Sequence, residues 1–239
     1  MNFLVFQHIA IEHPGIFRDV MAEQGVDWTP VELDAGAPIP AVDGYDALIV
    51  MGGPMDVWQE DAHPWLVPEK AAIRAAVRDH GLPVLGVCLG HQLLAEALGG
   101  RVGKMAEAEV GILDIELTEA GRRDPLFQGL PATAKSLQWH GAEVAEAPPG
   151  ATVLAASPAC PVQAFAVDGR AWGIQYHLEI TATTVADWGA VPEYGASLEA
   201  TLGAGALGRL DRAAARHMDD FNRNARRLFG NFLDRVRAS

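Results

Sequence analysis

The chain has 239 residues, of which 49% are hydrophobic, and its 18 Lys and Arg residues against 31 Asp and Glu residues give a net charge of −13. This composition is typical of a globular protein that can bury a large core. A chain with this much negative charge repels phosphate backbones and anionic lipids. Neither nucleic acid nor a membrane surface is therefore expected as a partner.

The cysteines and the amino terminus indicate the compartment. Cys88 and Cys160 can form at most one disulfide, which fits a reducing cytosol better than secretion. The opening MNFLVFQHIA lacks a basic segment ahead of its apolar residues, so it is predicted to be a strand rather than a signal peptide. No apolar run approaches the roughly 18 residues of a membrane helix. We therefore expect a cytoplasmic protein.

The first hundred residues alternate between short apolar runs and segments with apolar residues at helical spacing. The predicted strands are 2–7, 47–51 and 82–88, and the predicted helices are 15–25, 68–80 and 89–100. Strands and helices that alternate at these lengths form βαβ units, so this part is predicted to be a parallel sheet covered on both faces.

After residue 108 the pattern changes to short strands without room for helices between them. These strands, 112–118, 151–157, 162–167 and 171–177, predict a small antiparallel extension of the sheet. Residues 196–235 predict one or two closing helices with an apolar stripe that packs on the sheet (Phe221, Leu228, Phe229 and Phe232). We expect a single domain over residues 1–239, with 181–239 as a helical C-terminal segment.

The sequence GVCLGHQ places Cys88 between Gly86 and Gly90, where a strand runs into a helix. A Gly-x-Cys-x-Gly turn is the cysteine counterpart of the nucleophile elbow, in which larger side chains at the glycines would collide with backbone. The thiol would lie at the carboxyl end of a strand and at a helix N-terminus, which favours a thiolate. The alternative is a buried structural cysteine beside an ordinary turn.

His177 is the best candidate for a base that serves this thiol. It ends a predicted strand, and Glu179 follows two positions later. In an extended segment the two side chains point to the same side, so the carboxylate can orient the imidazole. Cys88, His177 and Glu179 would then form a catalytic triad.

The third element is MGGP, residues 51–54, which follows a predicted strand. Gly52 and Gly53 leave backbone N–H groups free and allow a substrate to approach closely. The N–H of Gly53 and that of Leu89 could form an oxyanion hole.

Four segments together resemble the class I (triad) glutamine amidotransferases: MGGPMDVWQEDAHPWL, GVCLGHQLLAEALGG, LQWHG and GIQYHLEIT. The resemblance extends to stand-alone proteins related to the amidotransferase domain of GMP synthase. It implies a flavodoxin-like α/β fold, mostly parallel, and hydrolysis of a γ-glutamyl amide. It also implies that Cys88 is the nucleophile, His177 the base and Glu179 the orienting acid.

The resemblance further implies substrate-binding positions. Gln92 matches the elbow glutamine that contacts substrate, and Trp139, His140 and Gly141 match a loop beside the bound amino acid. Many members of the family have proline between the histidine and the glutamate, where this chain has Leu178. Leucine lacks the fixed φ of proline, so the pair is expected to be less stiff but still present.

The other candidate residues have no assigned chemistry. Cys160 lacks an elbow and is expected to be a buried or loop thiol. His8, His13 and His63 follow strand candidates and are expected at the pocket rim without a catalytic role. No cluster has metal-ligand spacing and no phosphate-binding glycine motif occurs, so no metal, nucleotide or other cofactor is expected.

Three functions remain open at this level. The chain could be a glutaminase subunit that passes ammonia to a synthetase partner, since it has no ATP-binding motif of its own. It could be a free-standing γ-glutamyl hydrolase or peptidase with another small-molecule substrate. The third is a catalytically silent binding or regulatory protein on the same fold. The leaving group would be recognised by loops 8–15, 55–66 and 181–195.

Overall fold

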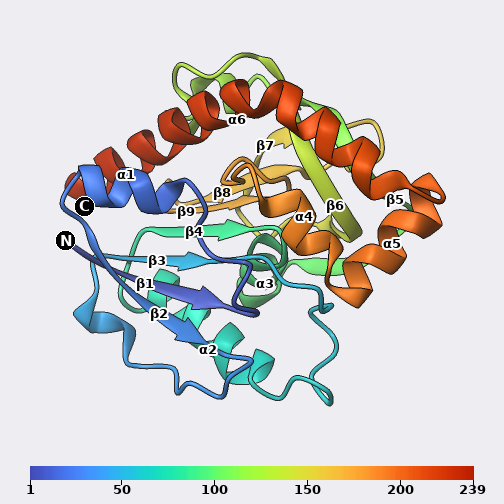
Figure 1. Ribbon diagram of the computed structural model, residues 1–239. Helices are drawn as coiled ribbons and strands as arrows, with labels where there is room; N and C mark the ends of the chain where they lie inside the picture. Colours follow the sequence, from blue (N-terminus) through green and yellow to red (C-terminus); the bar gives the residue numbers. More distant parts are fainter.

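The computed structural model describes all 239 residues and contains one nine-stranded sheet in the order β2-β1-β3-β4-β9-β8-β7-β5-β6 (Figure 1). The strands are β1 (Asn2–Gln7), β2 (Asp27–Glu32), β3 (Ala47–Val50), β4 (Val84–Val87), β5 (Arg101–Leu117), β6 (Thr133–Glu146), β7 (Thr152–Ala156), β8 (Ala164–Val167) and β9 (Ala171–Ile174). The α-helices are α1 (Phe17–Glu23), α2 (Leu66–Arg78), α3 (Leu89–Ala97), α4 (Thr184–Gly189), α5 (Pro192–Leu202) and α6 (Ala206–Arg237).

The sheet is parallel on one side and antiparallel on the other. Strands β2, β1, β3, β4 and β9 pair in parallel, and β8, β7, β5 and β6 continue the sheet with antiparallel pairings. The predicted α/β fold class is confirmed. The antiparallel side contains the two longest strands, so it is larger than the short predicted strands suggest.

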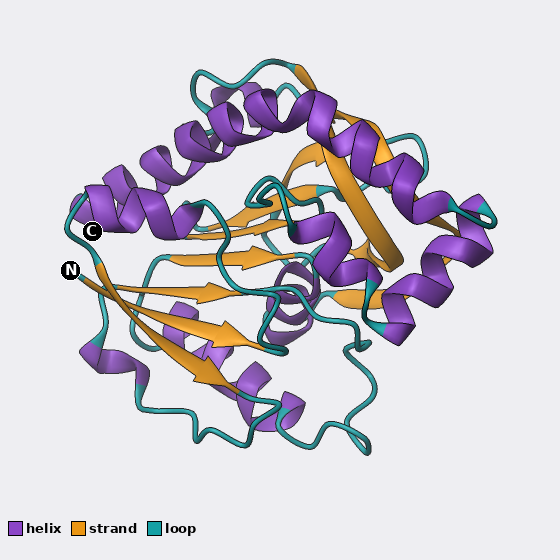
Figure 2. Cartoon of the chain, in the orientation of Figure 1, coloured by secondary structure: helices purple, strands orange, loops and turns teal.

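Helices cover both faces of the parallel strands, as the continuous apolar runs predict (Figure 2). In β1, Phe3 and Val5 join the core cluster that includes residues of α1 and α6, whereas Leu4 and Phe6 join the cluster of α2 and α3. A strand buried on both faces has no polar side to present, so its apolar residues run without alternation.

The long helix α6 closes the face of the sheet that also carries α1 (Figure 1). All four residues of its predicted apolar stripe are fully buried. Phe229 and Phe232 pack edge-on against Phe3 of β1, with ring centroids 6.5 and 6.1 Å apart. None of the helices is long and apolar enough to cross a membrane.

Two strands were not among the predicted ones: β2 and β6. The edge strand β2 contains Pro30 and only one buried residue, Val31, so it lacks the apolar run of its neighbours. The sequence LQWHG, expected in a loop, lies within β6. This placement makes Trp139, His140 and Gly141 part of the sheet, with His140 opposite Glu109 of β5.

The parallel strands end on the side where α4 and α5 lie (Figure 1). Parallel sheets place ligand crevices outside the carboxyl ends of their strands. The segments that follow β1, β3, β4 and β9 contain Glu12, Gly53, Cys88 and His177. The fold therefore brings the candidate residues to one edge of the sheet.

Candidate active site

Cys88 forms the turn between β4 and α3 with a strained backbone. Its φ is 53° and its ψ is −107°, a conformation that residues other than glycine rarely adopt. Such strain typically costs about 1–3 kcal/mol and persists only where surrounding structure enforces it. Here the Cys88 N–H donates to the Ile174 carbonyl at 2.8 Å, and the Gly90 N–H donates to the Met51 carbonyl at 3.1 Å.

The two glycines of the elbow are required by close packing. A Cβ at Gly86 would overlap the Gly90 carbonyl, and a Cβ at Gly90 would overlap the Val50 carbonyl at the end of β3. This agrees with the collision expected from the sequence. The tight turn brings the Cys88 side chain to the wall of a pocket, although its residue is only 6% exposed.

His177 and Glu179 form a buried pair, as the two-residue spacing predicts. The His177 Nδ1–H donates to Glu179 Oε1 at 2.7 Å, and both residues are 1% exposed. The pair follows β9, where His177 makes an isolated bridge with Leu137 of β6. Leu178 between them is buried in the core, so it anchors the segment that carries the two side chains.

The electrostatic surroundings of His177 favour its protonated form. Burial alone would lower the pKa of His177, but the charge of Glu179 and the adjacent Cys88 raise this pKa well above its ordinary value. Trp188 of α4 packs edge-on against the imidazole at a centroid distance of 4.5 Å. The ring is thus held between a carboxylate, a thiol and an indole.

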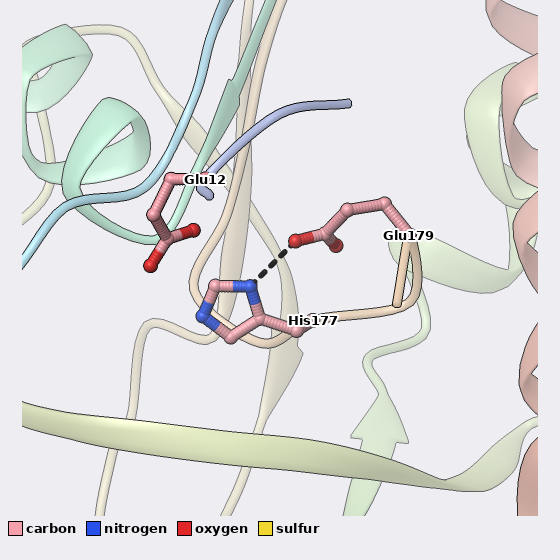
Figure 3. A group of neighbouring side chains, drawn as sticks. All are labelled: Glu12, His177 and Glu179. Atoms are coloured by element: carbon pink, nitrogen blue, oxygen red, sulfur yellow. Dashed lines mark hydrogen bonds and ion pairs between the residues drawn. The ribbon is translucent and has the colours of Figure 1, made fainter. Parts of the chain in front are cut away.

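Glu12 is a third buried group beside this pair (Figure 3). It is 1% exposed and lies in the loop between β1 and α1. The same loop contacts the pair again through its backbone, because the Ile16 N–H donates to the Glu179 carbonyl at 2.8 Å. Burial raises the pKa of Glu12 to about 7, and the nearby His177 and a hydrogen bond from Tyr194 only partly offset it.

Tyr194 connects Glu12 to helix α5. Its hydroxyl donates to Glu12 Oε1, and its ring packs against Trp139 and Trp188 at 5.7 and 5.8 Å. The same residue lines the pocket beside Cys88. Helix α5 therefore forms one wall of the site and is bonded to a buried acid within it.

Glu12, His177 and Glu179 can each offer a metal-ligand atom within 4.8 Å of the others, a cluster that sequence spacing did not indicate. However, Glu179 already occupies the Nδ1 of His177, and the charges of Glu179 and Cys88 favour the protonated ring, which has no lone pair for a metal. The arrangement fits proton handling better than ligation. That the protein needs no metal stays a prediction.

The two candidate oxyanion donors belong to the same pocket as Cys88. Gly53 and Leu89 both line the pocket. The Gly53 N–H donates to no other group of the chain, and the Leu89 N–H begins helix α3, so it has no acceptor within that helix. Gly52, by contrast, does not line the pocket, and its carbonyl accepts a hydrogen bond from His8, which does not line the pocket either.

Among the predicted substrate positions, Gln92, Trp139, His140 and Gly141 all line the pocket. The Gln92 amide is held by its own donations to the Ala142 carbonyl at 3.2 Å and to Gln175 at 3.0 Å. Trp139 donates to the Tyr194 carbonyl at 3.3 Å, which ties β6 to α5. The four residues therefore form a rigid wall rather than a loop.

His140 has a buried acid of its own. Its Nδ1–H donates to the Ala142 carbonyl at 2.9 Å, and its Nε2 lies 3.2 Å from Glu109. Burial opposes ionisation of Glu109, but hydrogen bonds from His140, Ser157 and Gln163 hold the pKa of this carboxyl below its usual range. These bonds fix the orientation of His140 at the pocket.

Other candidates lie away from the reacting atoms. Cys160 is fully buried, and burial raises the pKa of its thiol to about 12, which agrees with the expected structural thiol. His91 of the elbow is buried against Phe165, and burial lowers its pKa to about 3, so it is a neutral core residue. His8 was expected at the rim, but it is fully buried and bonded to Glu69.

Several residues of the site were not found from sequence: Glu12, Glu69, Asp56, Trp188, Glu193 and Tyr194. Glu12 had one available signal, because it is an acid within the first loop after a parallel strand. The others are brought in by helices and loops whose packing the local sequence does not indicate.

Comparisons with known proteins show the family. The family model for class I glutamine amidotransferases matches residues 16–187, and the chain belongs to this family. The glutamine amidotransferase-like protein YfeJ of Salmonella typhimurium is 33% identical over 190 residues, which cover 77% of each chain. GMP synthase of Corynebacterium efficiens is 36% identical over 171 residues, 71% of this chain but 28% of that protein.

Solved structures extend the similarity over the whole chain. A glutamine amidotransferase from Thermotoga maritima superposes with a TM-score of 0.86 at 26% identity, covering 100% of this chain and 99% of the other. A second, from Methylobacillus flagellatus, gives 0.84 at 28% identity and covers 98% and 94%. The similarity therefore includes α4–α6, which lie largely beyond the residues that the family model matches.

Proposed function

We propose that this protein is a cysteine-dependent amidohydrolase that releases ammonia or an amine from glutamine or another γ-glutamyl amide. The observation that carries the proposal is the strained Cys88 at the pocket, placed beside the His177–Glu179 pair. Family membership supports glutamine hydrolysis in general. The triad and the substrate are our proposal.

The reaction begins with attack of the Cys88 thiolate on the side-chain carboxamide carbon. The N–H groups of Gly53 and Leu89 stabilise the oxygen of the tetrahedral intermediate, whose negative charge develops only during the reaction. The protonated His177 gives its proton to the leaving nitrogen, the C–N bond breaks, and a γ-glutamyl thioester remains.

Water then completes the cycle. His177, now neutral, accepts a proton from a water molecule that attacks the thioester carbon. Collapse of the second intermediate breaks the C–S bond, releases glutamate and restores the thiolate with a protonated imidazole. Glu179 orients the ring throughout and stabilises its positive charge without taking the proton.

The pocket suits a single amino-acid side chain. Its volume of about 100 Å³ is small beside the ~300–1,000 Å³ of typical ligand sites. Asp56 and Glu193 at its wall would attract the α-ammonium group of a γ-glutamyl compound. All three loops that were expected to recognise the leaving group contribute residues at the pocket or the triad: Glu12, Asp56 and Tyr194.

Two alternatives differ in their need for a partner. A glutamine-hydrolysing subunit of GMP synthase from Pyrococcus abyssi is 40% identical over 106 residues, which are 44% of this chain and 55% of that protein. This similarity favours a subunit that supplies ammonia to a synthetase. The α5 wall, bonded into the site through Tyr194, favours a self-sufficient hydrolase. We favour the second. The intact Cys88, His177 and Glu179 set disfavours a catalytically silent protein.

Steady-state assays of the purified protein test the proposal. Glutamine and a panel of γ-glutamyl amides are supplied, and free glutamate and amine are measured. Turnover of at least one compound, lost in Cys88→Ala, is expected. Negligible turnover on every compound that rises sharply when a co-purifying protein is added would instead support the subunit function. No turnover under either condition would contradict the proposed chemistry.

A further inference from the structure

The peptide between Gly52 and Gly53 accepts a hydrogen bond from a buried histidine, which is itself bonded to a buried carboxylate. The His8 Nδ1–H donates to the Gly52 carbonyl at 2.8 Å, and His8 Nε2 lies 2.8 Å from Glu69 Oε1. His8 and Glu69 are both 0% exposed. Neither residue touches the pocket, and the reaction described above uses neither.

The fold explains how residues so far apart in the sequence meet. Strands β1 and β3 are parallel neighbours with Phe6 opposite Val50, so the residues that follow them, His8 and Gly52, lie side by side. Glu69 comes from the first turn of α2, where the helix dipole favours a carboxylate. Trp65, which precedes α2, stacks on the His8 ring at 5.5 Å.

The planarity of the peptide bond transmits this contact to the pocket. The chain has no cis peptide bond, so the Gly52 carbonyl and the Gly53 N–H point in opposite directions within one rigid unit. A donor that holds the carbonyl on the side of His8 therefore directs the N–H away from His8. On that other side lies the pocket with Cys88 and Leu89.

We propose that His8 and Glu69 are positioning residues that fix the Gly52–Gly53 peptide with its N–H directed at the oxyanion. Two glycines in succession would otherwise let this peptide rotate, because neither residue restricts φ strongly. The pair replaces that freedom with a charge-assisted hydrogen bond, which is among the stronger kinds in proteins. The inference deepens the proposed function, on which its kinetic part rests.

The surroundings of the pair support a fixed rather than a switching peptide. Burial alone would lower the pKa of His8, but the charge and hydrogen bond of Glu69, the Gly52 carbonyl and the charge of Glu12 raise it. A Cβ at Gly52 would lie 2.7 Å from Glu12 Oε2, and one at Gly53 would lie 2.8 Å from His8 Cβ. Neither glycine therefore has room for a side chain.

A fixed peptide bears on the question of a partner. In a subunit that must not waste glutamine, the oxyanion donors would be completed only when the partner binds. Here the donor is held by residues of the same chain. The His8–Glu69 pair therefore favours a self-sufficient hydrolase.

The test uses a variant in which both partners become apolar, His8→Phe/Glu69→Leu, so that no unpaired charge is buried. A thermal melt near that of the wild type shows that it folds. We expect kcat to fall on the order of 10²-fold, as for loss of one oxyanion donor, with KM changed less than about threefold because the donor acts in the transition state. Glu69→Gln is the matched control, since its amide can still donate to His8 Nε2 and leave Nδ1–H on the carbonyl. It should stay within about tenfold of the wild-type kcat.

A crystal structure of the double variant gives a readout that does not depend on activity. We expect the Gly52–Gly53 peptide to rotate or to occupy two orientations, whereas Glu69→Gln keeps one. A double variant with the wild-type peptide orientation and a kcat within threefold of wild type would overturn the inference. If the wild type hydrolyses no amide, the proposed function fails, and the peptide orientation still decides this inference.

Discussion

Two buried histidine–carboxylate pairs can be compared: one lies beside Cys88 and the other is bonded to the Gly52 carbonyl. The His177–Glu179 pair spans two residues of one segment, with 2.7 Å between its atoms, and the His8–Glu69 pair spans 61 residues, with 2.8 Å. Both pairs are almost inaccessible to water. In each pair one ring nitrogen is bonded to the carboxylate, and the pairs differ in the partner of the other nitrogen. His177 neighbours Cys88, whereas His8 donates to a backbone carbonyl.

This difference teaches that burial and pairing alone do not define a catalytic histidine. In both pairs the carboxylate raises the pKa of the imidazole against the effect of burial. A proton acceptor is useful only where a group that must gain or lose a proton comes within reach. The first pair has such a neighbour and the second has a neutral oxygen, so we propose proton transfer for the first pair and orientation of a peptide for the second.

The largest effect on activity is expected from replacing the thiol that lies beside the first pair and not beside the second. Cys88→Ala should reduce glutamate release by about 10⁴–10⁶-fold, since the covalent step is lost. Cys160→Ala, the matched control, should keep activity near that of the wild type, because Cys160 is bonded only within its own turn. Glutamate release by both purified variants is the measurement. Activity lost only in Cys160→Ala would contradict the assignment.

Removing the base should reduce activity almost as much as removing the thiol. His177→Ala should abolish formation of the thioester, because His177 is the group that we propose protonates the leaving nitrogen. Rapid-quench measurement of enzyme-bound γ-glutamyl label, with Cys88→Ala as the blank, checks this. Thioester build-up at the wild-type rate in His177→Ala would show that another group acts as the acid.

Replacing each of the two carboxylates by its amide tests whether the two pairs have different roles. Glu179→Gln should lower kcat on the order of 10²–10⁴-fold, since the amide stabilises neither the tautomer nor the charge of His177. Glu69→Gln should cost less than about tenfold, because a neutral His8 can still donate its Nδ1–H. Measurements of kcat for the two variants under the same conditions give the ratio of the two losses. Equal losses in the two variants would remove the proposed distinction between the pairs.

The smallest expected effect is on the pH dependence of stability, and it depends on Glu12. This carboxyl group faces His177, Glu179, His8 and Tyr194. Its pKa is raised from 4.5 to about 7, so the folded protein binds this proton more tightly than the unfolded chain. The resulting stability is fully present below pH 4.5 and is lost as pH rises towards 7. The loss should be roughly 3 kcal/mol, at about 1.4 kcal/mol per pKa unit.

Glu12→Gln cannot release a proton, but its amide oxygen can still accept from Tyr194. Urea unfolding of wild type and variant between about pH 4.5 and 8 measures the difference between their free energies of unfolding. We expect the wild type to lose stability relative to the variant as pH rises. A difference that is constant over this range would show that folding does not raise the pKa of Glu12.

The sequence could predict the parts of the fold that depend on burial along one segment. Strands β1, β3 and β4 are buried on both faces, so their apolar runs are continuous. Strands β5 and β6 were predicted in part or not at all. Each has an exposed stretch, and their pairing is interrupted by register shifts near Arg101 and Lys104, which break the alternation on which prediction relies.

The elbow and the His177–Glu179 pair were determined by the sequence itself, because glycine spacing fixes a tight turn and a two-residue separation in an extended chain fixes a common side. The contributions of His8, Glu69, Glu12 and Tyr194 were decided only by tertiary structure. His8 meets Gly52 because β1 and β3 are parallel neighbours, and Glu12 meets Tyr194 across 182 residues because α5 packs over the ends of the strands. A contact that depends on how separate elements pack produces no periodic pattern in the sequence of either segment. The groups that surround Cys88 and His177 can therefore be identified only in the folded structure.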